Sequence, residues 1–111
     1  MAHNISECNY MNQVLWTDVH PYEIVERCTE SRMKIRAMDH KLSENSPKPV
    51  FYPGGFVGHY EGQEKMKYDY TPNESYPIVT IRRHKDGQWR CPGGNRYLPS
   101  VEPRYFRDMN F

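Results

Sequence analysis

Proline and glycine punctuate this chain so often that no segment keeps the apolar period of a helix. Nine prolines and seven glycines are spread over 111 residues, and each candidate helix is interrupted by one of them. Short runs of β-branched and aromatic residues recur between these breaks. The sequence therefore predicts an all-β fold: a small antiparallel open barrel or sandwich of roughly five to seven short strands, with little or no helix and the size of an SH3 domain.

The length predicts one domain spanning residues 1–111. Residues 1–11 are polar with no clear period, and we expect a loose N-terminal arm or a short first strand there. Hydrophobic residues make up only 37% of the chain. Its nine tyrosines, four phenylalanines and two tryptophans must therefore supply much of the buried area.

The clearest hairpin joins Tyr22–Cys28 to Arg32–Met38 through the polar loop Thr29–Ser31. A half-buried antiparallel sheet needs apolar pairs on one face and polar pairs on the other. The register that satisfies both predicts two facing pairs, Val25 with Ile35 and Glu26 with Lys34. The charged stretch Asp39–Pro49 that follows has no period that would bury it, and it predicts a surface loop.

A second hairpin contains the Asp-Gly signature of a two-residue type I′ turn within Lys85–Gln88. That turn predicts Arg83 opposite Arg90, and His84 opposite Trp89. Like charges that face each other destabilise a sheet unless both point to solvent or an anion lies between them. We therefore predict a nucleotide or other anion site at Arg83 and Arg90, with Trp89 as a stacking surface. The alternative is that long arginine stems cover apolar surface while their heads stay in water.

The other candidate region is Phe51–Tyr60, which sets three glycines and a proline among four aromatic residues. Its Pro53-Gly54 pair fits the centre of a type II turn. The segment predicts either a ligand-facing loop, with His59, Phe56 and Tyr60 at its rim, or a buried bend that joins two strands.

Other classes of site find little support in the residue spacing. Five histidines occur without His-x-His or His-x-x-x-His pairs, so we expect no metal site. The isolated Cys8, Cys28 and Cys91 indicate neither a disulfide framework nor a zinc ribbon. No nucleophile elbow or Walker loop occurs, and we expect neither a cofactor nor an enzymatic activity. No apolar run is long enough for a signal peptide or a membrane span, which predicts an intracellular protein that does not enter a membrane.

The charge balance and the C-terminal sequence bear on partners. Fifteen basic and fourteen acidic residues leave a formal charge of +1, which argues against a non-specific nucleic-acid coat but allows a local basic patch. Tyr105–Phe111 is rich in aromatic residues, whereas a frayed tail would be polar. It predicts either an edge strand that docks on the same chain or a contact with a neighbouring subunit in a homodimer.

Two blocks of sequence carry a family resemblance. Asp18–Glu26 reads Asp-x-x-Pro-Tyr-x-x-Val-Glu, and Pro53–His59 reads Pro-Gly-Gly-Phe-x-Gly-His. With these blocks the chain resembles a family of small uncharacterised proteins of tailed bacteriophages. It departs from that family at the end, where Phe106, Arg107 and Met109 replace tyrosines. The resemblance implies a phage origin and a place in the host cytoplasm, and by analogy a host-takeover or anti-defence role.

These observations favour a non-enzymatic binding protein that sequesters or inhibits a host component. The target is a host protein or a nucleotide or nucleic-acid ligand. One alternative is a structural component of a virion or its assembly. The other is an enzyme that depends on a cysteine or on a metal held by His59.

Overall fold

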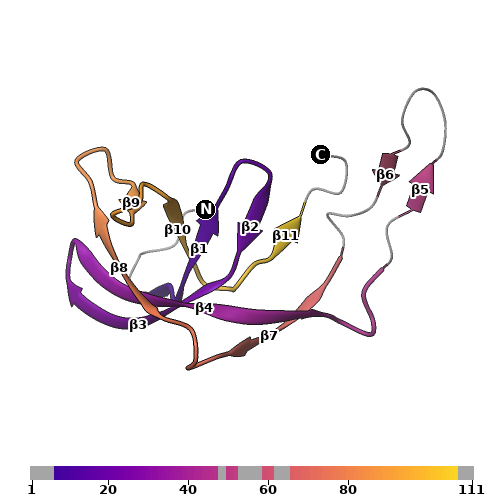
Figure 1. Cartoon of the computed structure of the whole chain (residues 1–111), viewed down its shortest axis with the longest axis horizontal. Coiled ribbons are helices and arrows are strands. Elements are labelled where there is room, and N and C mark those ends of the chain that lie inside the picture. The colour runs from indigo at the N-terminus through magenta and orange to yellow at the C-terminus, as the bar shows by residue number, and fades with distance from the viewer. Residues whose placement is uncertain (1–6, 48–49, 53–58, 62–65, 108–111) are drawn as a thin grey trace.

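The computed structural model describes residues 7–47, 50–52, 59–61 and 66–107 (Figure 1). Within these ranges the chain forms strands and turns and no α-helix, which confirms the predicted all-β class. The strands in chain order are β1 (Tyr10–Val14), β2 (Asp18–His20), β3 (Tyr22–Thr29), β4 (Arg32–Leu42), β5 (Val50–Tyr52), β6 (His59–Glu61), β7 (Tyr68–Pro72), β8 (Ile78–Arg83), β9 (Trp89–Arg90), β10 (Arg96–Ser100) and β11 (Phe106–Arg107).

Six of these strands close into an antiparallel barrel in the order β1, β3, β4, β8, β9, β10 and back to β1. In the closing pair, β1 and β10 stay in register from Tyr10 opposite Ser100 to Val14 opposite Arg96. Pairing of these two strands leaves neither of them as an open edge. The predicted small antiparallel barrel is therefore confirmed, and it is closed and not open.

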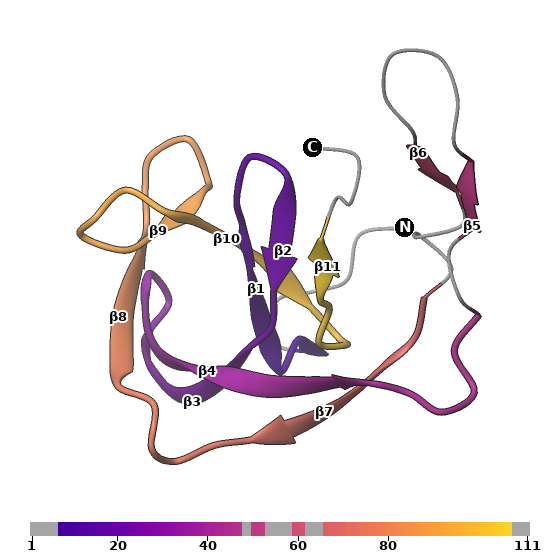
Figure 2. The same cartoon turned by 45° about the vertical axis from the view of Figure 1, so that its right-hand side comes forward.

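The remaining strands extend this barrel. β2 pairs with β1, and β11 pairs with β2, while β7 lies beside the second half of β4. β5 and β6 form a separate two-stranded sheet. Figures 1 and 2 show this small sheet at the opposite end of the molecule from β8 and β9.

The barrel interior is filled by large side chains that alternate with outward-facing residues along each strand. Its buried cluster contains Met11, Met33, Ile35, Ile81, Trp89 and Tyr97. Tyr22 of β3 packs against this cluster, with its ring edge to face with that of Tyr97 at 5.2 Å between centroids. Burial raises the pKa of Tyr97, whose hydroxyl oxygen accepts a hydrogen bond from Gln13 Nε2 at 3.3 Å. Trp89 and Tyr97 are the aromatic members of this cluster, and its other four residues are methionines and isoleucines, so the aromatic share of the core is smaller than the composition predicted.

The β3–β4 hairpin keeps one predicted pair and loses the other. Glu26 lies opposite Lys34, with 3.4 Å between the carboxylate and the ammonium. Ile24 lies opposite Ile35, and the prediction for Val25 was wrong because the register shifts between Ile24 and Glu26. Such a β-bulge adds one unpaired residue to a strand. It leaves Val25 41% exposed and puts the better-buried isoleucine on the core face.

β4 is longer than the sequence predicted. Its residues 39–42, assigned above to the surface loop Asp39–Pro49, continue the strand and pair with β7. Both faces of a two-stranded arm can carry polar residues, so the hydrophobic pattern gave no sign of this strand. Asp39 also accepts hydrogen bonds from Tyr76 Oη at 2.6 Å and Asn73 Nδ2 at 2.8 Å. These bonds fix the loop between β7 and β8 against β4.

The C-terminal segment docks on its own chain as far as the structure describes it. β11 pairs with β2, and Tyr105 stacks on His40 with 3.6 Å between ring centroids. The backbone N–H of Tyr105 donates to Tyr70 Oη at 2.8 Å. Burial under these rings lowers the pKa of His40. The edge-strand prediction thus holds for Phe106–Arg107, and residues 108–111 of the predicted tail lie outside the described part.

Candidate functional site

Four arginines occupy matching positions on four neighbouring strands of the barrel, and we call them the arginine row. Three directly opposite pairs define the row: Arg32 with Arg82, Arg82 with Arg90, and Arg90 with Arg96. Adjacent strands are about 4.8 Å apart, so the four Cα atoms follow one another across about 14 Å of sheet. Each arginine has a buried core residue as its strand neighbour, which places the row on the outer face of the barrel.

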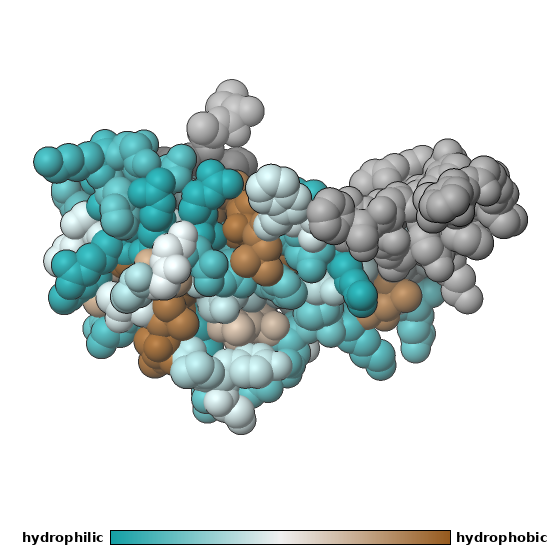
Figure 3. Space-filling model, turned by 45° about the horizontal axis from the view of Figure 1, so that its top comes forward, coloured by the Kyte–Doolittle hydropathy of each residue, from teal (hydrophilic) through white to brown (hydrophobic). Residues whose placement is uncertain are grey.

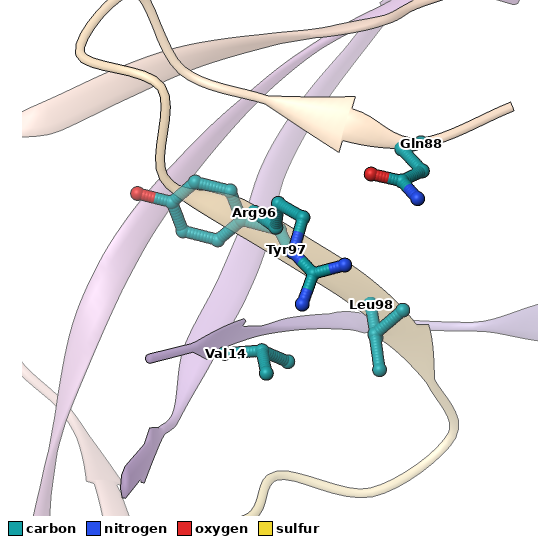
Figure 4. A pocket seen from close by; sticks show the side chains of 5 residues that line it. All are labelled: Val14, Gln88, Arg96, Tyr97 and Leu98. Carbon is teal, nitrogen blue, oxygen red and sulfur yellow. The ribbon is translucent and has the colours of Figure 1, made fainter. Parts of the chain in front are cut away.

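Figure 4 shows this outward placement at the end of the row. The side chain of Arg96 leaves β10 on the same side as that of Leu98, beside Val14 of β1, and the ring of Tyr97 points to the other side. These residues and Gln88 line a small hollow of about 80 Å³. Arg96 thus borders a hollow that is lined in part by the apolar Val14 and Leu98, and it is exposed at the surface.

The turn between β8 and β9 decides which arginine joins the row. The N–H of His84 donates to the carbonyl of Gln88 at 2.8 Å, and the N–H of Gly87 donates to that of His84 at 2.9 Å. Only Gly87 has a positive φ, of 83°, whereas a type I′ turn needs positive φ at Asp86 as well. The loop is therefore a type I turn followed by a glycine bulge, and the type I′ prediction was wrong.

This turn moves the register by one residue from the predicted one. Arg82, and not Arg83, lies opposite Arg90, and Arg83 lies opposite Trp89. The turn between β9 and β10 repeats the geometry, with the N–H of Gly94 donating to the Cys91 carbonyl at 2.9 Å and a Gly94 φ of 91°. Two loops of equal length on either side of the two-residue β9 thus bring three arginines into line.

Two adjoining hollows follow the row, and together we call them the arginine groove. One, of about 650 Å³, is lined by Arg32, Arg82 and Arg90 together with His84. The other, of about 490 Å³, is lined by Arg90, Arg96 and Trp16. Arg90 and Gly94 belong to both hollows, and no carboxylate is among the described residues that line either one. Hydrophilic side chains predominate at this end of the molecule, where β8 and β9 lie, with some hydrophobic surface among them (left in Figure 3).

The arginines differ in how their charges are balanced. Arg90 Nη2 lies 2.9 Å from Asp86 Oδ2 and 2.7 Å from Gln88 Oε1. The pKa of Asp86 is lowered, chiefly by the hydrogen bond from the Gln88 backbone N–H and further by Arg90, so this carboxylate stays ionised. The guanidinium groups of Arg32, Arg82 and Arg96 have no hydrogen bond or ion pair with the residues that the structure describes.

The six residues predicted to bind ligand do not all meet in this groove. Arg90 lies in the row, and Arg83 is exposed one position further along β8. Trp89 is 2% exposed, and its ring belongs to the core. β6 carries His59 and Tyr60 at the opposite end of the molecule in both views, and their side chains and Phe56 lie outside the described part.

Three of the four arginines in the row were not among the residues predicted to bind ligand. Arg82 and Arg96 are close in sequence to Arg90, but their alignment with it depends on the two turns. Arg32 is fifty positions before Arg82 and reaches the row only through the β4–β8 pairing. No local pattern in the sequence predicts the pairing of β4 with β8.

Comparison with models of protein families, with curated proteins and with solved structures gave no match to this chain. Among the described residues, no three His, Cys, Asp or Glu side chains gather closely enough to hold a metal ion. The same part of the chain contains no helix that is both long and apolar enough to cross a membrane. The arginine groove therefore stands on its own geometry as the candidate site.

Proposed function

We propose that this protein is a non-enzymatic binding protein that holds a phosphate-bearing ligand along the arginine row. The observation that carries the proposal is the register: four arginines face one another on adjacent strands, and three of them have no partner among the described side chains. A guanidinium group presents a planar fork of N–H donors that matches two phosphate oxygens. A chain of phosphates is the ligand whose negative charges match such a row of guanidinium groups.

The stability of the fold gives a second argument. Like charges directly opposite each other destabilise a sheet, by a few tenths to about 1 kcal/mol for each pair. The whole chain carries a formal charge of only +1, so the row is a local concentration of positive charge. Arrangements that work against folding are expected at functional sites. A bound polyanion would neutralise this repulsion.

The resemblance to tailed-phage proteins adds a biological setting to this proposal. In that setting the ligand is a nucleotide or nucleic acid of the infected cell, and the protein acts by sequestering it. A long arginine row and the absence of a nucleophile motif in the sequence both favour binding over catalysis.

Titration with a short inorganic polyphosphate tests the proposal, because this probe carries phosphate charge and no base. We expect binding at about 50 mM salt that weakens at least ~10-fold by about 200 mM, since several phosphate contacts release counterions together. Calorimetry or a competition assay measures the dissociation constant. Absence of binding at the lower salt concentration, or binding that salt leaves unchanged, would refute the proposal.

The Asp86→Asn substitution is expected to tighten polyphosphate binding about two- to fivefold, the range of one exposed ion pair. The asparagine side chain removes the charge that competes for Arg90 but keeps an oxygen to accept the Gln88 N–H, which now lies 3.0 Å from Asp86 Oδ1. The turn should therefore persist. Asp69→Asn is the control, since it makes the same change on β7, away from the groove. We expect its affinity for polyphosphate to stay within about twofold of that of the wild type. Equal gains in both variants would mean that only net charge matters.

A further inference from the structure

Trp16 is the most exposed large apolar side chain among the described residues, at 91% of its surface. It lies in the turn between β1 and β2, where the Leu15 N–H donates to the Asp18 carbonyl at 2.9 Å. Tryptophan combines a large apolar area with a flat aromatic face, and folded proteins usually bury most of it. A tryptophan left in water beside a functional groove is a candidate for direct contact with a ligand.

The position of Trp16 continues the arginine row. Val14 of β1 lies opposite Arg96, the last arginine, and Trp16 follows two residues later. Trp16, Leu15, Arg90 and Arg96 line one hollow of about 490 Å³. The ring of Trp16 therefore borders the same part of the arginine groove as Arg90 and Arg96, which we propose to bind phosphate.

We propose that the ligand of the arginine groove is a single-stranded nucleic acid, with a base stacked on Trp16 and its phosphates on the arginine row. This inference rests on the proposed function and names the class of its ligand. Proteins that bind single strands combine a positive groove along the backbone with aromatic side chains on which bases stack. Free polyphosphate would use only the first of these parts. A duplex keeps its base faces stacked inside, where Trp16 cannot reach them.

The length of the groove sets the size of the ligand. From β4 to β1 the groove crosses four interstrand spacings, which is about 19 Å. Phosphates of a stacked strand follow one another about every 3.4 Å, so roughly six nucleotides fill this distance. This is near the lower end of the site sizes known for small β-barrels that bind single strands, about 4 to 16 nucleotides.

Two probes of equal charge separate base stacking from phosphate binding. The first is an oligothymidylate of about six nucleotides, and the second is an abasic sugar-phosphate strand of the same length. Wild-type protein should bind the thymidylate about 5- to 150-fold more tightly, the range for one base on an aromatic ring. In Trp16→Ala this preference for the thymidylate over the abasic strand should disappear. Trp16→Phe should keep part of the preference, and Trp16→Leu, which has bulk but no aromatic face, should not.

The two proposals fail in different ways in this experiment. Salt-sensitive binding of both probes with equal affinity would overturn the stacking inference and leave the phosphate-binding function in place. No binding of either probe would overturn both. Tighter binding of a duplex of the same sequence than of the single strand would also contradict the inference. Because Trp16 is exposed, its substitution should not disturb folding, and near-identical denaturation curves will verify this.

Discussion

In the Arg82→Thr variant, polyphosphate binding is expected to weaken about 10- to 100-fold while the ligand-free protein becomes more stable. Loss of a charge-assisted hydrogen bond costs about 1.5–3 kcal/mol, which sets the size of the affinity change. The gain in stability comes from the position of Arg82, which has Arg32 on one side and Arg90 on the other. Threonine removes two repulsive pairs and suits an outward strand position, so the free energy of unfolding should rise by about 0.5–1 kcal/mol.

Opposite signs for binding and stability make this result diagnostic. Urea denaturation gives the free energy of unfolding, and calorimetry gives the dissociation constant. Lys41→Thr is the matched control, since it removes one positive charge from β4 at an exposed position opposite Asp69. We expect that variant to bind polyphosphate nearly as well as the wild type and to gain no stability. If Arg82→Thr lost both stability and binding, Arg82 would be holding the sheet together and the row would not be a binding site.

The all-β class could be predicted because its signals are local. Prolines and glycines mark the turns, and the strands between them show β-branched and aromatic residues. The pairing of Glu26 with Lys34 also came from a local pattern. The displacement of Val25 could not be predicted in this way, because a bulge adds one residue to a strand without changing the alternation of polar and apolar residues on either side of it.

The site was harder to predict than the fold because it depends on contacts between distant segments. Arg90 could be found from the nearby Asp-Gly turn, but the type of that turn was decided by the backbone of Asp86 and Gly87, and one residue of register separates Arg82 from Arg83. Trp16 joins the groove through the closing β1–β10 pair. The β1–β10 pair joins residues more than eighty positions apart, and the hydrophobic period of neither segment predicts that they pair.

The two tryptophans illustrate this limit and give the second large prediction. Trp89 was expected to stack on a ligand, whereas Trp16 was not among the residues predicted to bind one. In the closed barrel Trp89 points inward, opposite Tyr97, and is 2% exposed. Trp89→Ala should therefore lower the free energy of unfolding by about 3–5 kcal/mol, through lost burial and the cavity that remains. Since domains of this kind have about 5–15 kcal/mol in total, this is a large share of the stability.

Trp16→Ala is the matched control for that measurement, with the same atoms removed from an exposed turn. Its effect on the free energy of unfolding should stay within about 0.5 kcal/mol. Trp89→Phe should fall between the two, because the phenyl ring refills part of the cavity. The outcome that would contradict the core assignment is a Trp89→Ala protein that unfolds like the wild type but binds oligothymidylate poorly. In that case Trp89 would stack on the ligand, as the sequence first indicated. Arg90 and Arg96 would then lie on the opposite face of the sheet from the stacking residue.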